Sequence, residues 1–446
     1  MPTLARCLLV VIFLLSAGVC PVAAQMAANP APLFRGLFGG AAPARDNMLD
    51  FTASGFAGYV QDIVPAGQPS LPSSTFQGAN ASLTFQRQWQ HATVGAYGNA
   101  GTSYFNDAPA DQSPWINRWD VGARAGFDRR IARRTTFSAD GSVGYSPYYG
   151  FGTIGQGIFT GTGNIQSIPG FDYTVAKQPT LNFAGHVTVS QALSPRSSLE
   201  AYYTMNTVAF LESATVDGFG AQRTQTVGAR YRYSINRYVS ARAGYGYMRS
   251  VYGGIDSEPV VSHILDVGVD GGYGKEYRIA RRTTFSFDTR SSIFVADQVS
   301  TDEAFHPTTQ FFLGGSVALA HRWARTWRAD ARYDRSAGFV DGFRDPVFSN
   351  TTSASVNGLP LPRLDFTAST SYAFGNVGFG GVDNSFSTTT ATAQLRYALS
   401  RNIATYGQYF YYRYHFDAGV VLPGTVTPML DRQGVSVGVT LWLPLY

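Results

Sequence analysis

The sequence predicts an all-β protein, a closed antiparallel transmembrane β-barrel of about 18 strands. Three observations support this fold class. Apolar and polar residues alternate with a period of two along most of the chain, short turns recur between the alternating segments, and the first residues form an export signal.

The N-terminal segment directs the chain out of the cytoplasm. Arg6 supplies a positive charge, residues 8–17 form an apolar run, and small residues precede the expected cleavage point. This order is typical of a signal peptide over residues 1–24, with cleavage between Ala24 and Gln25. The apolar run is short for a membrane-spanning helix, which needs roughly 20 residues.

The segment that follows, residues 25–47, is rich in proline and glycine and predicts a flexible periplasmic lead. It could instead plug the barrel, which we place at residues 48–446. Both cysteines, Cys7 and Cys20, belong to the signal peptide, so the mature chain is expected to contain neither disulfides nor thiolate metal sites.

The composition argues against a set of soluble domains. The chain contains 48 glycines, 14% aromatic residues and only 14% charged residues. The mature chain offers no run of 18 apolar residues for a transmembrane helix. The formal net charge of +5 is mild, and no nucleic-acid-binding motif accompanies it, so we expect no nucleic-acid partner.

The period-two alternation is clearest between residues 227 and 247. Val227, Ala229 and Tyr231 alternate with Gly228 and Arg230, and the pattern resumes after a short turn. Such segments extend over about 10 residues, the length at which a tilted strand crosses an outer membrane. Only a closed barrel pairs every backbone group of these strands in lipid, which places the apolar face toward lipid and the polar face toward the lumen.

Short turns, most of which bear arginine, punctuate the strands and recur at intervals near 40 residues. They centre near Trp89, Ala132, Pro195, Asn236, Ala280, Trp323, Pro362 and Arg401. One turn phrase, Ile131–Ser138, recurs unchanged as Ile279–Ser286. Longer Gly-, Asp- and Pro-rich connections separate the hairpins, at 146–180, 211–222, 252–262, 297–306, 336–350 and 374–386.

Eight short-turn hairpins, with one strand before them (49–61) and one after (433–445), predict 18 strands, and 16 is the rival count. The strand near 351–361 is the weakest of the predicted strands. An even count places both termini on the short-turn side, which is periplasmic in bacterial barrels. Tryptophans near the strand ends predict aromatic girdles at the membrane interfaces: Trp89, Trp119, Trp323, Trp327 and Trp442.

The final strand alternates strictly from Val435 to Leu445, and the sequence ends on the aromatic Tyr446. This ending resembles the insertion signal of outer-membrane proteins, which the barrel-assembly machinery recognises. The expected partners are therefore outer-membrane lipid and that machinery.

The whole arrangement over residues 48–446 resembles large Gram-negative outer-membrane barrels. More narrowly, the phrases Leu193–Tyr203, Leu399–Tyr406 and Tyr409–Tyr414 are similar to those of a β-barrel porin family associated with exopolysaccharide export. The resemblance implies passage across the envelope, of polysaccharide or of small hydrophilic solutes, and does not imply a particular substrate.

Charged residues in phase with the polar face are the candidate lumen-lining set, since an arginine on the lipid face would cost roughly 2–4 kcal/mol near the midplane. They can form a charged constriction that selects solutes, or cross-strand ion pairs that brace the wall. Because the signs alternate, bracing is the favoured role for any single residue. The set is Asp120, Arg124, Asp128, Asp140, Arg230, Arg232, Arg242, Asp266, Asp270, Asp288, Arg290, Arg328, Asp330, Arg332, Asp334 and Arg396.

A channel is the leading functional hypothesis, and a non-conducting barrel with binding loops is the alternative. The aromatic loop 146–180 is a candidate for narrowing the pore or for stacking on sugars, and an ordinary surface loop is equally compatible with its sequence. A barrel enzyme is a remote third hypothesis. None of the six histidines lies in a recognisable catalytic phrase, so we predict no catalytic residues, no metal and no cofactor.

Overall fold

The computed structural model describes most of the chain after residue 46. The described ranges are 47–62, 74–89, 92–106, 115–116, 121–146, 179–211, 220–253, 259–271, 277–298, 306–323, 326–340, 342–379, 383–422 and 426–445. The predicted signal peptide, its cleavage site at Ala24 and Gln25, nearly all of the 25–47 segment, Asp120, residues 147–178 and Tyr446 lie outside these ranges. Those predictions stay predictions.

Every described regular element is a β-strand, and all of them belong to one antiparallel sheet. The strands are β1 (Asn47–Asp62), β2 (Ser74–Trp89), β3 (Ala92–Phe105), β4 (Trp115–Ile116), β5 (Val121–Ala132), β6 (Thr135–Ser146), β7 (Thr180–Ala192), β8 (Ser197–Phe210), β9 (Gln222–Ser234), β10 (Val239–Tyr252), β11 (Val260–Leu265), β12 (Gly268–Gly271), β13 (Tyr277–Ala280), β14 (Thr283–Gln298), β15 (His306–His321), β16 (Arg328–Gly338), β17 (Val347–Leu361), β18 (Leu364–Val377), β19 (Ser385–Ala398), β20 (Ile403–Phe416) and β21 (Met429–Pro444).

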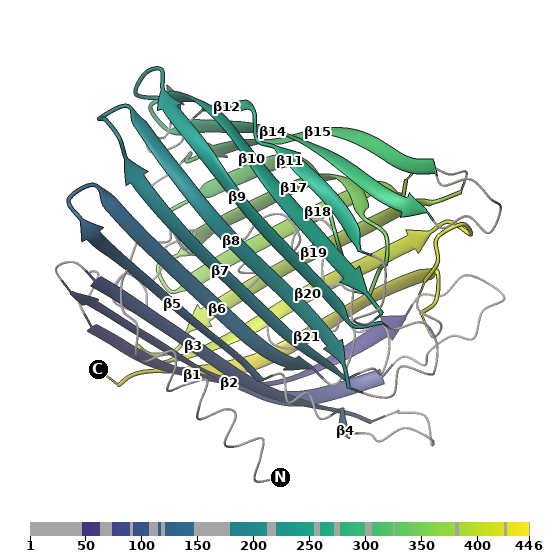
Figure 1. The fold of residues 1–446 in the computed structure, drawn as a ribbon. Helices are drawn as coiled ribbons and strands as arrows, with labels where there is room; N and C mark the ends of the chain where they lie inside the picture. The colour runs from purple at the N-terminus through teal and green to yellow at the C-terminus, as the bar shows by residue number, and fades with distance from the viewer. Residues whose placement is uncertain are drawn as a thin grey trace, which may run out of the picture.

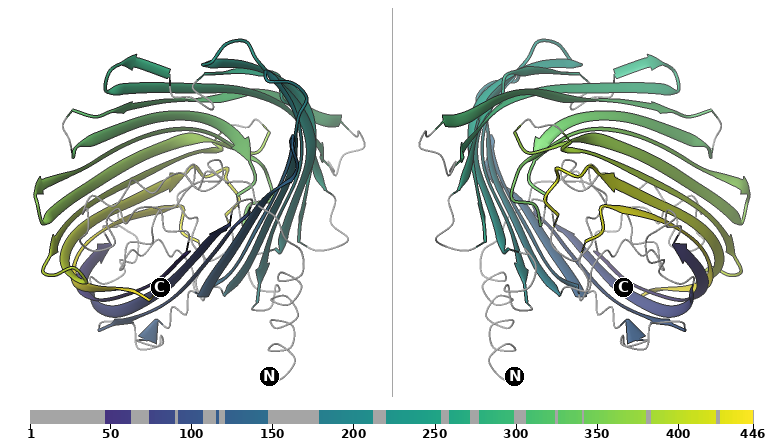
Figure 2. Two further views of the ribbon diagram at one scale, coloured as in Figure 1. Left: turned by 90° about the vertical axis from the view of Figure 1, so that its left-hand side faces the viewer. Right: turned by 90° about the vertical axis from the view of Figure 1, so that its right-hand side faces the viewer.

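The sheet closes into a barrel because β1 pairs with β21 along most of its length, from Asp50 opposite Pro444 to Asp62 opposite Arg432. Figure 1 shows the tilted strands, and Figure 2 shows the closed wall from two further sides. Segments β4 and β5 both pair with β3 and form one interrupted strand, as do β11, β12 and β13 beside β14. The 21 segments therefore make 18 spanning strands, which confirms the predicted count.

The eight predicted short turns all join neighbouring strands at one rim of the barrel. The weakest predicted strand, near 351–361, is β17. Both described ends of the chain lie at this short-turn rim, since Asn47 pairs with Arg87 and the backbone N–H of Leu445 donates to the carbonyl of Leu49 at 2.7 Å.

The two copies of the repeated turn phrase fold alike. In the first hairpin the strand register shifts between Arg130 and Ala132, and in the second it shifts between Arg278 and Ala280. A β-bulge at the same place in both copies indicates that the local sequence, and not its surroundings, sets this turn.

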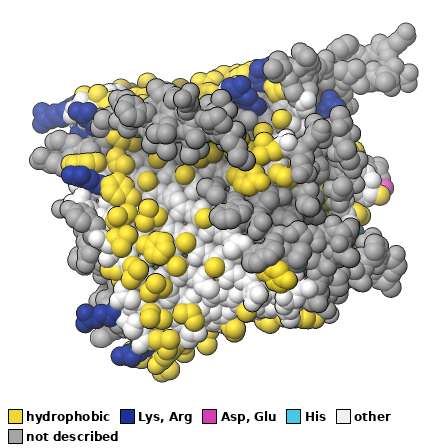
Figure 3. All heavy atoms as spheres, turned by 90° about the horizontal axis from the view of Figure 1, so that it is seen from below, with side chains coloured by type: hydrophobic (Ala, Val, Ile, Leu, Met, Phe, Trp, Pro, Cys, Tyr) yellow, Lys and Arg dark blue, Asp and Glu magenta, His cyan; other side chains and the backbone are white. Residues whose placement is uncertain are grey.

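The outer face of the barrel carries exposed hydrophobic side chains on many of the described strands. Side chains such as Val227, Tyr245 and Leu313 are 54%, 50% and 58% exposed although they are hydrophobic. Figure 3 shows hydrophobic side chains spread over the coloured part of the face in view, with Lys and Arg gathered mainly along one edge. An apolar band with a charged border is the surface that a strand barrel presents to a bilayer.

Candidate functional site

The inner face of the barrel is the candidate site, and the strand register defines its residues. Arg230 lies opposite Gly244, and Arg232 lies opposite Arg242, while their outward neighbours are apolar. Paired residues of adjacent strands share a face, so following the pairings around the barrel assigns every strand. The predicted residues inside the described ranges all fall on this inner face: Arg124, Asp128, Asp140, Arg230, Arg232, Arg242, Asp266, Asp270, Asp288, Arg290, Arg328, Asp330, Arg332, Asp334 and Arg396.

The inner face of β8 to β16, which we call the charged wall, holds two ion-pair networks. In the first, Arg230 contacts Glu200 (Nη2–Oε1 2.6 Å) and Asp266 (Nη1–Oδ2 3.5 Å). Arg242 contacts Asp266 (Nε–Oδ1 2.5 Å) and Asp270 (Nη1–Oδ1 2.6 Å). Arg242, Asp266 and Asp270 are only 8%, 7% and 3% exposed, so this is the buried centre of the wall.

Arg232 completes the first network through Asp270, with Nη2–Oδ2 at 3.7 Å, so three arginines face three carboxylates. Glu200 is the member that sequence reasoning missed. Ser198, Glu200 and Tyr202 alternate with more apolar residues on β8, and the same parity rule would have found it.

The second network joins β14 to β16. Arg290 contacts Asp288 at 3.1 Å and Asp334 at 3.6 Å, and Arg332 contacts Asp334 at 3.1 Å. Nearer the short-turn rim, Arg328 and Asp330 form a separate pair at 2.6 Å. Every arginine of the two networks has a carboxylate partner, so the networks themselves are close to neutral. This balance favours bracing as the role of the set.

Two smaller pairs lie on other strands of the inner face. Arg396 of β19 contacts Asp365 of β18. Arg124 of β5 lies 3.7 Å from Asp140 of β6, whose other carboxylate oxygen lies 3.3 Å from His186 Nδ1. The Arg124 and His186 side chains are 40% and 41% exposed, so solvent screens this pair far more than the centre of the charged wall.

The inner face of β1, β2, β20 and β21 is different, and we call it the aromatic wall. Phe56, Phe76 and Phe410 are buried against one another, with the Phe56 and Phe76 ring centroids 6.1 Å apart in an edge-to-face arrangement. The rings lie over glycines on neighbouring strands. A Cβ atom added to Gly78 would stand 2.5 Å from the Phe56 ring, and one added to Gly434 would stand 2.5 Å from the Phe410 ring.

A folded loop between β16 and β17, described at residues 339, 340 and 342–346, packs against the aromatic wall at its long-loop end. Phe343 is 2% exposed, and its ring centroid lies 5.7 Å from that of Phe416 on β20. Val340 of the loop and Tyr412 and Tyr414 of β20 belong to the same hydrophobic cluster. We call this segment the inner loop.

The inner loop also touches the opposite side of the barrel. The Gln222 amide of β9 donates to the Phe343 carbonyl at 3.1 Å, and the Tyr252 hydroxyl of β10 donates to the Gly342 carbonyl at 3.4 Å. Phe210, at the end of β8, packs against the same cluster. The loop therefore links the charged wall to the aromatic wall across the interior, at the long-loop end of the strands.

Sequence reasoning placed a long connection at 336–350 but did not predict that it folds inward. It proposed loop 146–180 for that role, and residues 147–178 lie outside the described residues. The apolar content of this connection could have indicated that it is buried, since Val340, Phe343 and Pro346 are unusual together in a solvated loop.

The inner loop carries one titratable group in an unfavourable setting. Burial raises the pKa of the Asp345 carboxyl above its ordinary value, and the neighbouring Arg344 opposes that shift only in part. The charged form of Asp345 is therefore disfavoured while the loop is docked.

No group of three or more His, Cys, Asp or Glu side chains within the described ranges could hold a metal ion. Within the same ranges, no helix has the length and apolar character needed to cross a membrane.

No family model and no curated protein sequence matches the chain. Similar solved structures include OpdQ of Pseudomonas aeruginosa, with 10% identity and a TM-score of 0.42 over 90% of this chain and 98% of that one. OccK11 (OpdR) of the same organism has 14% identity and a TM-score of 0.43, covering 93% and 100%. OccAB4 of Acinetobacter baumannii has 11% identity and a TM-score of 0.40, covering 90% and 100%.

At identities and TM-scores this low, nothing about solute or mechanism carries over to this chain. The narrower resemblance to a porin family of exopolysaccharide export finds no support in these matches.

Proposed function

We propose that this chain is a channel of the bacterial outer membrane that passes small hydrophilic solutes, with the inner loop as its constriction. The observation that carries the proposal is the contrast between the two faces of one closed barrel. The outer face is an apolar band, and the inner face holds ion pairs that would be too costly to expose to lipid.

The size of the barrel supports a water-filled interior. Barrels of 16–18 strands are wider than side chains alone can fill. Beside the charged wall, the inner face of β17 to β19 carries many hydroxyl groups, among them Ser353, Ser369, Ser371 and Thr390. Charged and hydroxyl groups together make a surface along which a hydrated solute can exchange its water for protein contacts.

The inner loop favours small solutes over an exported polymer. A polysaccharide chain needs a lumen that is clear from end to end, whereas Phe343 and its neighbours join the two walls across the interior. Export of polysaccharide would require this loop to leave its packed position.

Insertion by the barrel-assembly machinery through the final strand is part of this proposal. The outward residues Val435, Val437 and Val439 of β21 are about half exposed or more, so this strand presents an apolar face to its surroundings. The stacked rings of Trp323 and Trp327, 5.7 Å apart at the short-turn rim, are suited to a membrane interface.

Planar-bilayer recording of the refolded protein tests the function. We expect stable open steps from the native sequence and larger steps from Phe343→Ala, because that substitution removes the ring that holds the inner loop against β20. Phe311→Ala is the matched control, since Phe311 is 62% exposed on the outer face and should leave the step size unchanged.

A folded barrel that stays silent in the bilayer, with or without Phe343→Ala, would contradict the channel and favour a scaffold with binding loops. Folding is checked separately by circular dichroism and by the heat-dependent gel mobility of the barrel.

A further inference from the structure

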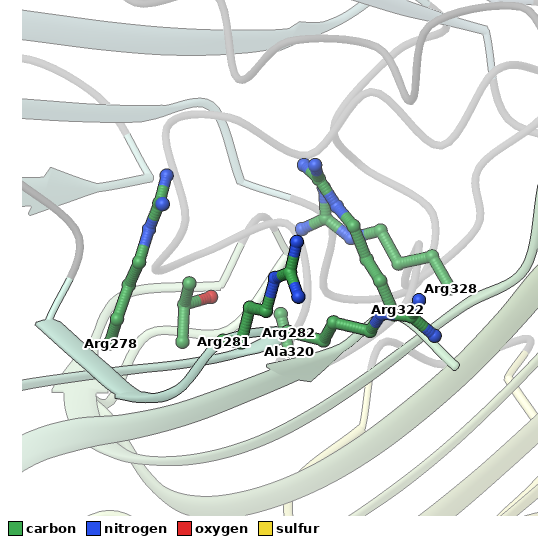
Figure 4. Close-up of a pocket in the computed structure, with 7 residues that line it drawn as sticks. Arg278, Arg281, Arg282, Ala320, Arg322 and Arg328 are labelled. Carbon is green, nitrogen blue, oxygen red and sulfur yellow. The ribbon is translucent and has the colours of Figure 1, made fainter. Parts of the chain in front are cut away.

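Five arginines surround a cavity of about 130 Å³ at the short-turn rim. Arg278 comes from β13, Arg281 and Arg282 form the next turn, and Arg322 and Arg328 flank the turn between β15 and β16. Thr284 and Ala320 complete the lining. We call this site the arginine pocket, and Figure 4 shows Arg278, Arg281 and Arg322 extending to the same side of the strands.

The pocket opens toward the interior of the barrel. Arg278 pairs with Thr284, Thr284 pairs with Ala320, and Ala320 pairs with Asp330. Paired residues share a face, and Asp330 belongs to the charged wall, so Arg278 and Arg328 stand at the mouth of the lumen.

The charge of the pocket is unbalanced, unlike that of the two ion-pair networks of the charged wall. Arg328 contacts Asp330 at 2.6 Å. Among the residues that the structure describes, no carboxylate lies within salt-bridge distance of Arg278, Arg281 or Arg322. Counting only the described residues, five arginines against Asp330 leave an excess of four positive charges around this small cavity.

The turn itself does not require this excess, because the barrel contains a second copy of the same hairpin. Residues 130–138 and 278–286 are identical in sequence and share the same bulge. In each copy the second turn arginine donates to a carbonyl of the next hairpin: Arg134 to Leu193 at 3.5 Å, and Arg282 to Trp323 at 3.0 Å.

The two copies differ in what the neighbouring hairpin supplies. The Ala192 backbone N–H donates to the Arg134 carbonyl at 2.8 Å, as that of Arg322 does to Arg282 at 2.9 Å, so Ala192 occupies the place of Arg322. Ser198 pairs with Ala192 and occupies the place of Arg328. Two arginines thus stand at rim positions where alanine and serine form the same fold in the other copy.

We propose that the arginine pocket binds a multivalent phosphate anion at the short-turn mouth of the lumen. Guanidinium groups pair with phosphate oxygens through two parallel hydrogen bonds. A phosphate group carries about −1.5 to −2 charge and three acceptor oxygens. Two phosphate groups therefore match the excess of four positive charges, whereas a single carboxylate leaves most of it uncompensated.

This inference rests on the proposed channel function, because it names a class of solute that the channel would pass. Anion binding is measured in detergent, without a bilayer. A barrel that does not conduct would therefore contradict the proposed channel function but would not affect the binding result. Because the pocket faces the lumen, the phosphate belongs to a soluble ligand and not to a lipid headgroup.

The test is calorimetric titration of the full-length barrel, folded in zwitterionic detergent, with inorganic pyrophosphate, and with acetate for comparison. We expect one pyrophosphate site per chain and much weaker binding of acetate. Arg322→Ala with Arg328→Ser gives this copy the residues of the other and should weaken pyrophosphate binding about a hundredfold, about tenfold for each guanidinium.

Three further variants separate the site from general effects. Arg278→Gln with Arg281→Gln should also weaken binding, and it leaves Asp330 with its partner. Ala192→Arg with Ser198→Arg should raise the stoichiometry to two by building the pocket at the other hairpin. Arg133→Ala with Arg134→Ala, in the copy that lacks a pocket, should change nothing.

The proposal is overturned if pyrophosphate does not bind, or if acetate binds with equal affinity. It is also overturned if pyrophosphate binding is unchanged both in Arg322→Ala with Arg328→Ser and in Arg278→Gln with Arg281→Gln. A second arm places the barrel in nanodiscs of phosphatidylcholine with added phosphatidylglycerol. Enrichment of phosphatidylglycerol around the barrel that depends on Arg322 and Arg328, without pyrophosphate binding, would assign the pocket to a lipid headgroup and overturn the soluble ligand.

Discussion

The charged wall and the aromatic wall line the same lumen but are stabilised by different interactions. On the charged wall, Arg242 lies between Asp266 and Asp270, and each charge is compensated by a neighbour of the opposite sign. On the aromatic wall, Phe410 and Phe56 lie over glycines of adjacent strands and need no polar partner. Ion pairing therefore stabilises the charged wall, and close packing of rings on glycines stabilises the aromatic wall.

Different substitutions are expected to destabilise the two walls. A buried ion-pair network fails when one partner is removed, because the remaining charge is left without compensation. An aromatic layer is destabilised when a glycine beneath it is replaced by a larger residue, because the backbone leaves the ring no space to move away. Substitutions on the two walls should therefore have different signatures.

Removing the centre of the charged wall should have the largest effect on stability. Arg242→Met leaves Asp266 and Asp270 buried with reduced compensation, and we expect the free energy of unfolding to fall by about 3–5 kcal/mol. Denaturant titration of the barrel folded in lipid vesicles, followed by tryptophan fluorescence, measures the change.

Arg124→Met is the matched control on the same face. Its pair with Asp140 is longer, and the arginine is 40% exposed, so the loss should stay below about 1 kcal/mol. Equal losses in the two variants would show that burial does not distinguish the charged wall from an exposed pair.

Filling a glycine beneath the aromatic wall should cost less. A methyl group at Gly434 would lie 2.5 Å from the Phe410 ring and 2.8 Å from the Tyr59 carbonyl oxygen. We expect Gly434→Ala to lower the free energy of unfolding by about 1–3 kcal/mol through overpacking, measured in the same titration.

Gly407 provides the comparison, since it lies on neighbouring β20 and an added Cβ would meet nothing within 4 Å. Gly407→Ala should change the free energy of unfolding by less than about 0.5 kcal/mol. If Gly434→Ala were as mild as Gly407→Ala, the ring would not be held against the glycine.

The same contrast explains how much the sequence could predict. Alternation located the charged wall because polar inner residues stand out against apolar outer ones, as in Ala241, Arg242 and Ala243. It also gave the strand count and the turns. On β20 both faces are largely apolar or aromatic, from Tyr409 to Tyr412, so the period of two carries no contrast and the aromatic wall was not predicted.

Trp442 illustrates the same limit. Its place near a strand end predicted a residue of the membrane-facing girdle, and this was wrong. Trp442 pairs with Thr52 on the inner face and packs with Ala398 and Ala404. Residue type alone does not give the face when apolar side chains occupy both sides of a strand.

Long-range contacts could not be predicted at all. The hydrogen bond from Gln222 to the Phe343 carbonyl joins residues 121 positions apart, and no local pattern encodes it. The arginine pocket likewise depends on two successive hairpins that the pairing of β14 with β15 brings together, although the repeated phrase that forms half of it was visible in the sequence.

The smallest expected effect concerns the inner loop, which joins the two walls. Burial raises the pKa of Asp345, so the docked loop holds this proton more tightly than a free loop does. Docking is therefore most favoured below the ordinary Asp range, about pH 4, and loses that preference as the pH rises through the raised pKa.

We accordingly expect the single-channel conductance to fall as the pH is lowered from neutral, because protonation of Asp345 strengthens the contact of the inner loop with both walls. Asp345→Asn mimics the protonated form and should give the low conductance at every pH, with the acid-dependent change reduced. A conductance profile that is the same in Asp345→Asn and in the native sequence would assign the pH dependence to other groups, and the inner loop would then join the two walls without responding to acid.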